Sequence, residues 1–578
     1  MRIAILLALS VLISCTEKKT VALLSDGSDL KLNEAVASTL AKHKADTFRL
    51  HLQSNTLAYG SANQISVDVM VSVLDPDKKQ IAFYDGPARG AENFQFRTKA
   101  PGIYKIVVAP FQENEGKYSV TLTFADILAG DPGKQIEQIV NATMRVTDGV
   151  TPGVSVAVAR DGKVVYSNGF GYADIEQEAK VTPQTIFHIA SVSKQFTAFA
   201  IAMLANQGKL SVNDDIRKYL PELHDFGTPI TINHLIHHTS GLRDQWNLLA
   251  IAGWRLDDVI TQKQIMRVIS RQRDLNFKPG DEEMYCNTGY TLMAEIVERV
   301  SGKSFPQWAQ ENIFVPLGMK NTLVYNDHEK IVKGRAYSYN QAADGFRKSV
   351  LSYANDGATS LFTTPEDLCQ WAMNFENIKV GNPKVMDMMN QRFVLNRGDT
   401  INYAFGQVME KYKGLRAISH GGGDAGYRTF LLRFPEQHFS VVVFSNLGSF
   451  NPAGLCYQIA DIYLADQLKE EKPKDEQANT PSPQEPPFDA SKIKLSDFVG
   501  KFYSPELETA YTFAIENDTL RAHHQRHDDI KLVPYKKDSF MAGAWFLGEV
   551  TFIRNKTNQV VGMKAGSGRV RGVAFDKM

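Results

Sequence analysis

Hydrophobic and polar residues alternate along the first quarter of the chain in a way that is typical of β-strands. Between residues 30 and 125, runs such as 47–52, 65–73 and 102–108 place apolar residues at every second position, with turn sequences between the runs. A period of two sends alternate side chains toward one core. The pattern predicts a small β-sandwich over residues 31–128. No catalytic groups cluster there, so we expect it to serve as a spacer or a binding domain.

The periodicity becomes mixed after residue 131. A helical spacing over residues 136–144 is followed by a predicted hairpin over 154–166. A strand at 439–444 and a helix at 453–467 close this region. The mixture predicts an α/β domain over residues 129–468.

The rest of the chain divides into a polar segment and a second β region. Residues 469–490 are rich in Pro, Lys and Glu and cannot bury a core, so we predict a linker. Short strands return beyond it and predict a small antiparallel β-barrel or sheet over 491–578. Strand alternation sends His523 and His524 to opposite faces, so we interpret the segment 523–528 as a solvated strand end rather than a metal site.

The N-terminus is typical of an exported protein. A basic start and an apolar run too short to span a membrane predict a signal peptide over residues 1–14. Leu12-Ile13-Ser14-Cys15 resembles a bacterial lipobox, which implies cleavage before Cys15, a lipid on its sulfur and a tether over residues 15–30. We therefore expect a protein that is anchored by lipid in the cell envelope, periplasmic or at the outer membrane. An ordinary signal peptide with an incidental cysteine is the alternative.

Charge and cysteine content exclude several classes of protein. The chain has 64 basic and 64 acidic residues, and this balance argues against a nucleic-acid partner. Cys286, Cys369 and Cys456 form an odd, scattered set, which is not a disulfide framework. The hydrophobic fraction of 43% is enough to bury a sizeable core.

The first candidate for chemistry is a serine and lysine pair. Ser191 and Lys194 precede an apolar run, and their spacing predicts a shared face on the first turn of an amphipathic helix. A serine hydroxyl needs a neighbouring base, and a lysine becomes one when burial and the helix dipole lower its pKa. Alone the pair is a weak signal, because a chain of this length contains such a spacing by chance.

Tyr285 and Asn287 form a second candidate on a loop just before a predicted helix. The phenol could exchange a proton with Ser191 or a leaving group, and the amide could fix either a substrate carbonyl or Lys194. A packed tyrosine beside a capping asparagine is the alternative.

The third candidate is a histidine followed by three glycines, at His420-Gly421-Gly422-Gly423. Glycines let a backbone approach a ligand closely, and their amides can donate to a developing oxyanion. A flexible turn is the alternative interpretation.

Three motifs therefore occur in order: Ser191-x-x-Lys194, Tyr285-x-Asn287 and His420-x-Gly422. The set resembles the motifs of the penicillin-recognising serine hydrolases, which include class C β-lactamases, D-Ala-D-Ala carboxypeptidases, D-aminopeptidases and related esterases. The resemblance covers roughly residues 135–467. It implies a β-lactamase-like fold, in which an antiparallel sheet flanked by helices lies beside a helical subdomain and the site lies between them.

The resemblance also implies roles for the motif residues. Ser191 would be the nucleophile, Lys194 its base and Tyr285 the proton carrier to the leaving group. Asn287 and Gly422 would contribute to substrate binding, and the amides of Ser191 and Gly423 would form the oxyanion hole.

His420, on the opposite wall, stands where β-lactamases usually have lysine. A neutral imidazole holds a carboxylate less firmly than an ammonium does, which favours a peptidase or an esterase over an efficient β-lactamase. Arg428 could supply a carboxylate anchor instead, with an ordinary surface arginine as the alternative. Cys286 has no basic partner close in sequence and is interpreted as a wall residue.

The sequence thus predicts a serine hydrolase that acts through an acyl-enzyme on Ser191. The expected substrate is a D-Ala-type peptide or another small amide, and a small ester is the first alternative. A non-catalytic, wall-binding lipoprotein is the alternative from another class. The expected chemistry requires no metal or other cofactor.

Overall fold

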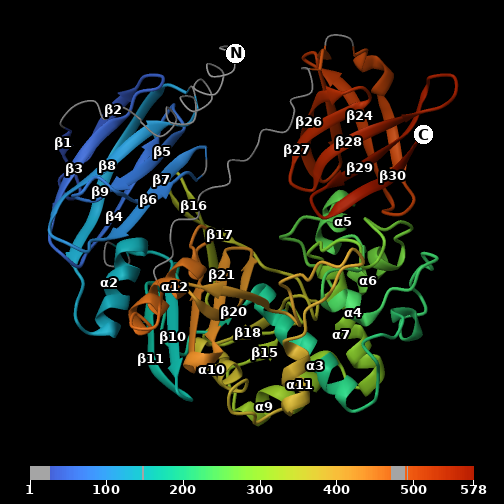
Figure 1. Cartoon of the computed structure of the whole chain (residues 1–578). Helices are drawn as coiled ribbons and strands as arrows, with labels where there is room; N and C mark the ends of the chain where they lie inside the picture. The colour runs from blue at the N-terminus through green and yellow to red at the C-terminus, as the bar shows by residue number, and fades with distance from the viewer. Residues whose placement is uncertain (1–26, 87, 113, 146–148, 470–487, 491–492) are drawn as a thin grey trace, which may run out of the picture. The chain divides into compact units, whose positions relative to one another are not determined.

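The computed structural model describes residues 27–578 except for 87, 113, 146–148, 470–487 and 491–492 (Figure 1). The predicted signal peptide, Cys15 and nearly all of the predicted linker lie outside the described residues. The chain forms two compact units, Met1–Gly149 and Val150–Met578.

The first unit is a β-sandwich, as predicted. One sheet has the order β1 (Ser28–Asp29), β3 (Asp46–Leu52), β8 (Gly102–Pro110), β5 (Val69–Leu74) and β6 (Gln80–Tyr84). The other has the order β2 (Ala35–Leu40), β9 (Gly116–Ile127), β4 (Thr56–Gln64) and β7 (Gly90–Arg97). Val69, Val71 and Val73 are fully buried, as the period of two requires. Helix α2 (Pro132–Met144) contacts β4 and β9 and belongs to this unit.

The second unit contains a six-stranded antiparallel sheet. Its order is β11 (Lys163–Phe170), β10 (Val154–Arg160), β22 (Phe439–Ser445), β21 (Tyr427–Phe434), β20 (Leu415–Asp424) and β19 (Val408–Tyr412). All seven residues of β22 are buried, so both faces of the sheet are covered. Helices α10 (Pro365–Met373) and α12 (Pro452–Tyr463) both contact this strand, which confirms the predicted sheet with flanking helices.

The remaining elements of this part of the chain lie between and around these strands in the sequence. The helices are α3 (Lys194–Asn206), α4 (Ile232–Ile236), α5 (Gln245–Ile251), α6 (Gln262–Ser270), α7 (Asn287–Ser301), α8 (Phe305–Ala309), α9 (Val315–Leu317) and α11 (Pro383–Met389). The strands are β12 (Tyr172–Asp174), β13 (Ala179–Lys180), β14 (Phe187–His188), β15 (Leu323–Val324), β16 (Ser338–Ala342), β17 (Gly345–Ser349) and β18 (Leu361–Thr363).

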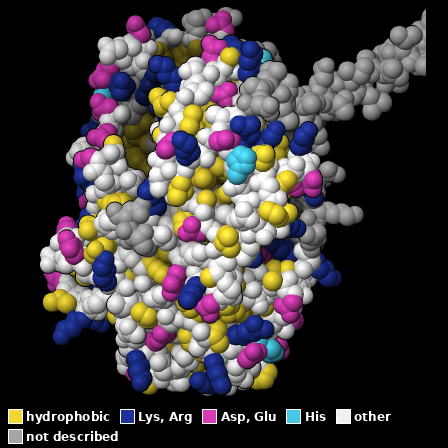
Figure 2. Space-filling view, turned by 90° about the vertical axis from the view of Figure 1, so that its left-hand side faces the viewer, with side chains coloured by type: hydrophobic (Ala, Val, Ile, Leu, Met, Phe, Trp, Pro, Cys, Tyr) yellow, Lys and Arg dark blue, Asp and Glu magenta, His cyan; other side chains and the backbone are white. Residues whose placement is uncertain are grey.

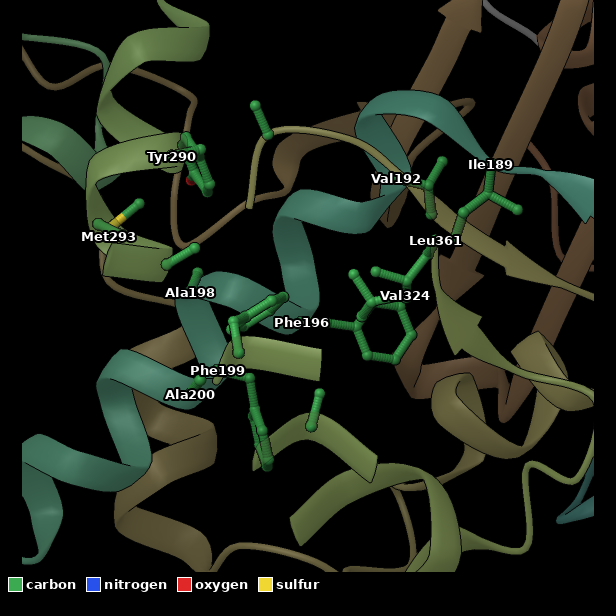
Figure 3. Packing of buried hydrophobic residues seen from close by; sticks show 14 of the residues in the cluster. Ile189, Val192, Phe196, Ala198, Phe199, Ala200, Tyr290, Met293, Val324 and Leu361 are labelled. Atoms are coloured by element: carbon green, nitrogen blue, oxygen red, sulfur yellow. The ribbon is translucent and has the colours of Figure 1, made fainter. Parts of the chain in front are cut away.

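Helix α3 lies at the centre of the hydrophobic core (Figure 3). Phe196 and Phe199 pack against Trp371, with ring centroids 4.4 and 5.1 Å apart. Side chains on every face of the helix are buried, so the expectation of an amphipathic helix is wrong. The physical reason is that residues 196–204 are apolar except for Thr197, which suits a helix enclosed by its neighbours.

The C-terminal part is a closed barrel of eight antiparallel strands, as predicted. The strands are β23 (Gly500–Ser504), β24 (Thr509–Glu516), β25 (Thr519–His524), β26 (His527–Lys536), β27 (Ser539–Ala544), β28 (Leu547–Arg554), β29 (Val560–Ser567) and β30 (Val570–Lys577). Leu248, Ala250 and Ile251 of α5 belong to the hydrophobic core of this barrel, and Figure 1 shows α5 at the barrel's lower end. The barrel is therefore joined to the preceding α/β part by a shared core.

Hydrogen bonds also hold the barrel against α5 and the residue before its N-cap. The buried Arg243 side chain donates to both carboxylate oxygens of Glu506, at 2.9 and 3.1 Å, and to the carbonyl oxygens of Arg571 and Gly572. The Tyr511 hydroxyl donates to the carbonyl oxygen of Ile251 at 2.9 Å.

Two histidines of the 523–528 segment lie in this interface. His527 Nε2 is 2.7 Å from the carbonyl oxygen of Ala250, and the His524 ring packs against Gly253, where an added Cβ would lie 2.2 Å from it. The interpretation of this segment as a solvated strand end is therefore wrong for these two residues, because α5 and the residues that follow it cover them. His523 lies apart from them, beside Glu516 and Asp529.

The surface carries both signs of charge. On the face shown in Figure 2, Lys and Arg side chains are interspersed with Asp and Glu, in keeping with the balanced composition. Among the described residues, no helix combines the length and the hydrophobicity needed to cross a membrane.

Candidate active site

A pocket of about 430 Å³ lies in the second unit, beside the end of β20. Five predicted site residues line it: Ser191, Tyr285, Asn287, His420 and Gly423. The pocket wall also includes Trp545 and Arg569 of the barrel. The three sequence motifs, far apart along the chain, thus meet at one cavity.

Ser191 lies on a tight turn that leads into α3. The turn is a 3-10 helix over Ala190–Ser193, and α3 begins at Lys194. Ala190 has a φ of 48°, in the left-handed region that residues with a Cβ rarely adopt. The half-buried Ser191 lines the pocket, while Ser193 and Lys194 are buried beneath it.

The Lys194 amine is held among three oxygen atoms. Nζ lies 3.3 Å from Ser191 Oγ, 2.8 Å from Asn287 Oδ1 and 2.7 Å from the carbonyl oxygen of Ala358. Burial lowers the pKa of Lys194 to about 7, although Asp244 opposes this effect. A neutral amine has two hydrogens, which the two carbonyl oxygens accept, so its lone pair is left to face Ser191.

The Tyr285 hydroxyl is buried and makes no hydrogen bond of standard geometry with any described residue. Burial raises the pKa of Tyr285, while the nearby Ser191 hydroxyl and the Arg569 guanidinium oppose this effect. The ring packs against His238 at a tilt, with centroids 4.2 Å apart. The hydroxyl thus lies near Ser191 and keeps its hydrogen-bonding capacity for another group.

Asn287 is fixed at both ends of its amide. It begins α7, and its backbone N and Nδ2 donate to Asp244 Oδ2 at 2.7 and 2.8 Å, which leaves Oδ1 for Lys194. Of the two partners considered for this amide, a substrate carbonyl and Lys194, the structure has Lys194.

His420 is a neutral wall residue. Its Nδ1 lies 2.7 Å from the carbonyl oxygen of Gly421 and therefore carries the hydrogen, while Nε2 accepts from the Tyr403 hydroxyl at 3.0 Å. Burial lowers the pKa of His420 to about 3. Both ring nitrogens are occupied, so this histidine has no N–H left to hold a substrate carboxylate.

The glycine run forms the end of strand β20 instead of a turn. Its outer neighbour β19 pairs only as far as Ser419, whereas β21 pairs as far as Asp424. The outer edge of residues 421–424 is therefore unpaired and borders the pocket. Backbone amides on such an edge are available to an oxyanion.

Gly422 and Arg428 are not among the pocket's lining residues. Gly422 faces the Ser191 turn, where an added Cβ would lie 2.3 Å from the carbonyl oxygen of Ile189 and 2.4 Å from Thr429 Oγ1. The Arg428 guanidinium turns back onto its own loop and donates to the carbonyl oxygens of Ala425 and Tyr427.

Comparison with known proteins agrees with this geometry. The family model described as Beta-lactamase matches residues 136–460, which is more than half of the chain. The chain belongs to the beta-lactamase family. This result confirms the resemblance inferred from the three motifs and places the chain in a family of serine hydrolases.

Two curated relatives are similar to about half of this chain. A D-aminopeptidase of Gluconobacter oxydans (strain 621H) is 29% identical over 295 residues, which cover 51% of this chain and 56% of that protein. Penicillin-binding protein 4* of Bacillus subtilis (strain 168) is 29% identical over 310 residues, which cover 50% and 67%. The match thus spans just over half of the D-aminopeptidase.

A solved octameric penicillin-binding protein homologue from Pyrococcus abyssi has a TM-score of 0.49 and 24% identity. The alignment covers 74% of this chain and 96% of that one.

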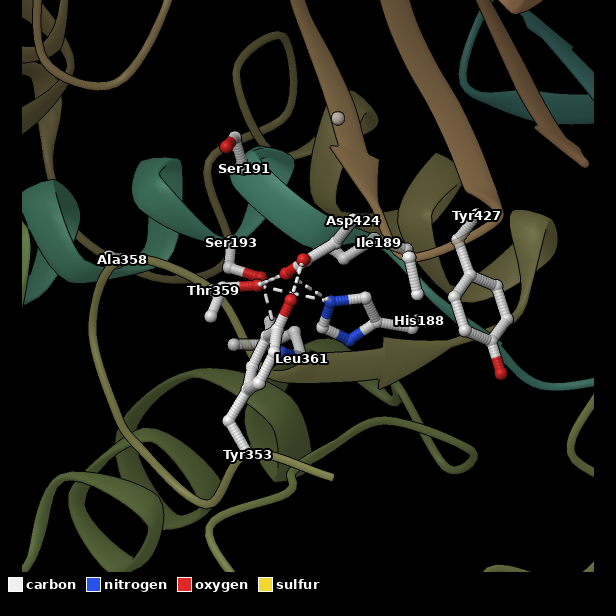
Figure 4. A network of polar contacts seen from close by, with 12 residues as sticks. His188, Ile189, Ser191, Ser193, Tyr353, Ala358, Thr359, Leu361, Asp424 and Tyr427 are labelled. Carbon is white, nitrogen blue, oxygen red and sulfur yellow. Dashed lines mark hydrogen bonds and ion pairs between the residues drawn. The ribbon is translucent and has the colours of Figure 1, made fainter. Parts of the chain in front are cut away.

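A polar network lies in the wall of this pocket (Figure 4). Tyr353, Thr359 and Asp424 line the pocket, and His188 is buried. Asp424 accepts from Thr359 Oγ1 at 2.9 Å, from the Tyr353 hydroxyl and from His188 Nε2 at 3.1 Å. Burial raises the pKa of Asp424, but these hydrogen bonds outweigh it and hold the pKa below its usual value. Since His188 precedes the Ser191 turn and Asp424 follows the glycine run, the network ties the two motifs together.

Sequence reasoning missed this network, although Asp424 adjoins the glycine run and His188 adjoins the Ser191 motif. It also missed Arg569 and Trp545, for which the sequence contains no motif. Cys286 is buried behind the wall, and burial raises the pKa of its thiol to about 12, in keeping with a packing role.

Proposed function

We propose that the protein is a serine hydrolase that cleaves small amides, with D-Ala-type peptides as the leading class, through an acyl-enzyme on Ser191. The observation that carries the proposal is the position of the Lys194 amine, 3.3 Å from Ser191 Oγ with two carbonyl oxygens on its other sides. Its pKa of about 7 gives a substantial neutral fraction at neutral pH.

In the proposed reaction, Ser191 Oγ attacks the substrate carbonyl while Lys194 takes the hydroxyl proton. The amides of Ser191 and Gly423 donate to the oxygen that becomes negative. Tyr285 gives a proton to the leaving nitrogen as the C–N bond breaks. Water then attacks the ester on Ser191 and releases the acid.

Active-site labelling tests the nucleophile. A fluorophosphonate probe followed by mass spectrometry of the adduct should place the label on Ser191, and Ser191→Ala should not label. Ser193→Ala is the matched control, because Ser193 Oγ lies in the same turn but accepts a hydrogen bond from the Leu361 amide. Labelling that persists in Ser191→Ala would refute the proposal.

Hydrolysis of small esters is the second candidate function. Amides are preferred here because the D-aminopeptidase of Gluconobacter oxydans and penicillin-binding protein 4* are among the similar proteins. A panel of D-amino acid amides, D-Ala-terminated peptides, esters and cephalosporins separates the candidates by their kcat/KM. Labelling by the probe without turnover of any of them, together with binding to peptidoglycan, would favour the wall-binding alternative.

We also propose that the protein is a lipoprotein of the cell envelope, on the basis of the Leu12-Ile13-Ser14-Cys15 sequence. Growth with a labelled fatty acid should label the protein in the membrane fraction. Cys15→Ala should lose the label. An unlabelled wild-type protein would contradict the proposal.

A further inference from the structure

We propose that the C-terminal barrel completes the active site and that its Arg569 binds a carboxylate on the leaving group of the substrate. The inference rests on the proposed hydrolase function and narrows it to peptides that end in a free carboxylate. Four observations carry it: the turn that presents Arg569, the contacts that fix this turn, the lack of a carboxylate partner for its guanidinium among the described residues, and its place beside Tyr285.

Arg569 lies at the tip of the β29–β30 hairpin. Ser567 pairs with Val570, so Gly568 and Arg569 form a two-residue turn, in which Gly568 has a φ of 50°. The turn reaches the pocket, and Arg569 is one of its lining residues. Trp545, on the turn between β27 and β28, lines the same pocket.

Hydrogen bonds with Asp244 and Asn276 hold this hairpin against the start of α5 and the loop that leads to Tyr285. The Arg569 carbonyl oxygen accepts from the Asp244 amide at 3.3 Å and from Asn276 Nδ2 at 2.9 Å. The Arg571 amide donates to Asn276 Oδ1 at 2.8 Å. Asp244 is also the partner of Asn287, so the hairpin and the second motif share one anchoring residue.

Among the charged side chains that line the pocket, Arg569 is the one with unused hydrogen-bonding capacity. Both oxygens of Asp244 are occupied, by the Trp246 amide and by Asn287, and both oxygens of Asp424 are occupied by its network. Among the described residues, no carboxylate lies within ion-pairing distance of the Arg569 guanidinium. A bidentate arginine with free donors is suited to a carboxylate ligand.

The position of Arg569 indicates which part of the substrate carries that carboxylate. Its guanidinium lies over the Tyr285 ring, 4.8 Å from the centroid. Tyr285 is the residue proposed to protonate the leaving nitrogen. In a peptide, the α-carboxylate of the last residue is two bonds from that nitrogen, so a cation beside Tyr285 lies close to where this group would be.

The assignment replaces Arg428, which sequence reasoning offered for this role. The Arg428 guanidinium donates two hydrogen bonds to carbonyl oxygens of its own loop, and His420 has no free N–H. Arg569 is thus a specificity-determining residue supplied by a separate part of the chain.

The test is a cycle of two substrates and two proteins. An N-acylated D-alanyl-D-alanine and its C-terminal carboxamide differ only in the group that Arg569 would bind. We expect wild-type kcat/KM to be roughly 10- to 100-fold higher for the acid, the range typical of a hydrogen bond to a charged group. Measured at a pH well above the Lys194 midpoint, Arg569→Gln should lower kcat/KM for the acid by the same factor and change it for the amide by less than about twofold.

Two further variants separate recognition from docking. Arg569→Lys keeps the charge and should recover part of the preference for the acid. Arg571→Gln removes a guanidinium of the same hairpin that pairs with Glu282, and should leave the preference unchanged.

The inference is overturned if the wild-type protein hydrolyses the amide as fast as the acid, or if Arg569→Gln keeps the wild-type preference. Hydrolysis of neither peptide by a protein that still labels at Ser191 overturns it as well and leaves the nucleophile in place. Absence of labelling in the wild-type protein is instead a failure of the proposed function.

Discussion

Nζ of Lys194 lies 2.8 Å from Oδ1 of Asn287, a residue 93 positions further along the chain. The Asn287 amide is oriented by Asp244, which binds both its backbone N and its Nδ2. A lysine that meets only neutral acceptors in a buried place loses its proton more easily than one that meets a carboxylate. Asn287 of the second motif therefore helps Lys194 of the first motif to act as a base.

The activity should depend on pH through Lys194. Because its pKa is lowered to about 7, kcat/KM should rise with pH along an acidic limb with a midpoint near 7. Arg569 lowers this pKa, so Arg569→Gln should move the midpoint upward, and Arg571→Gln should leave it in place. The measurement is kcat/KM between pH 5 and pH 10 for an uncharged substrate. A limb near the ordinary lysine value of 10.5 would contradict the assigned base.

Tyr285→Phe should separate stability from activity. The hydroxyl is buried and has no hydrogen-bond partner among the described residues, so its removal should leave the free energy of unfolding unchanged or raise it by about 1 kcal/mol. Loss of the proton carrier should lower kcat by roughly 10²- to 10⁴-fold. Urea unfolding and steady-state kinetics on one amide substrate measure both. A destabilised variant with normal kcat would show that the hydroxyl serves packing instead.

Neighbouring glycines of the third motif should respond differently to a methyl group. In Gly422→Ala the new Cβ would lie 2.3 Å from the carbonyl oxygen of Ile189, so the strand and the Ser191 turn must separate. We expect a loss of about 1–3 kcal/mol of stability and much slower labelling of Ser191. In Gly421→Ala the nearest atom is a side-chain carbon of Phe430 at 3.3 Å, which a small shift accommodates. Equal behaviour of the two variants would argue against the close approach.

Arg243→Leu should destabilise the second unit. It leaves the buried Glu506 carboxylate unpaired, which costs about 3–5 kcal/mol. Adding Glu506→Leu should recover much of this loss. Arg267→Leu is the control, since Arg267 pairs with Glu508 at the same interface but is 66% exposed, and it should cost less than about 1 kcal/mol. Thermal unfolding measures the loss of stability in each variant. Similar losses for Arg243→Leu and Arg267→Leu would contradict the prediction.

The sequence predicted the sandwich, the α/β domain and the barrel because each has its own local periodicity. It also predicted the residues of the three motifs, since Ser191 and Lys194, or Tyr285 and Asn287, are fixed relative to each other by one turn of backbone. Helix α3 shows where this reasoning fails. The sequence predicts an amphipathic helix, although the spacing of the apolar residues covers every face.

Arg569 was beyond the reach of such reasoning. Its place in the pocket depends on how the barrel docks, and docking depends on pairs such as Arg243 and Glu506, which are 263 residues apart. The same holds for the contact between His188 and Asp424, 236 residues apart. Long-range pairs of this kind have no periodicity that one sequence could reveal.

The seven residues of α5 limit which C-terminal barrels this protein can accept. Leu249 lies in the core of the catalytic part, while Leu248 and Ile251 lie in the core of the barrel. Asp244, which caps α5, also orients Asn287 and receives the hairpin of Arg569. A barrel taken from another protein would have to fit this helix before it could offer any side chain to the substrate, so substrate preference and folding are under one common constraint.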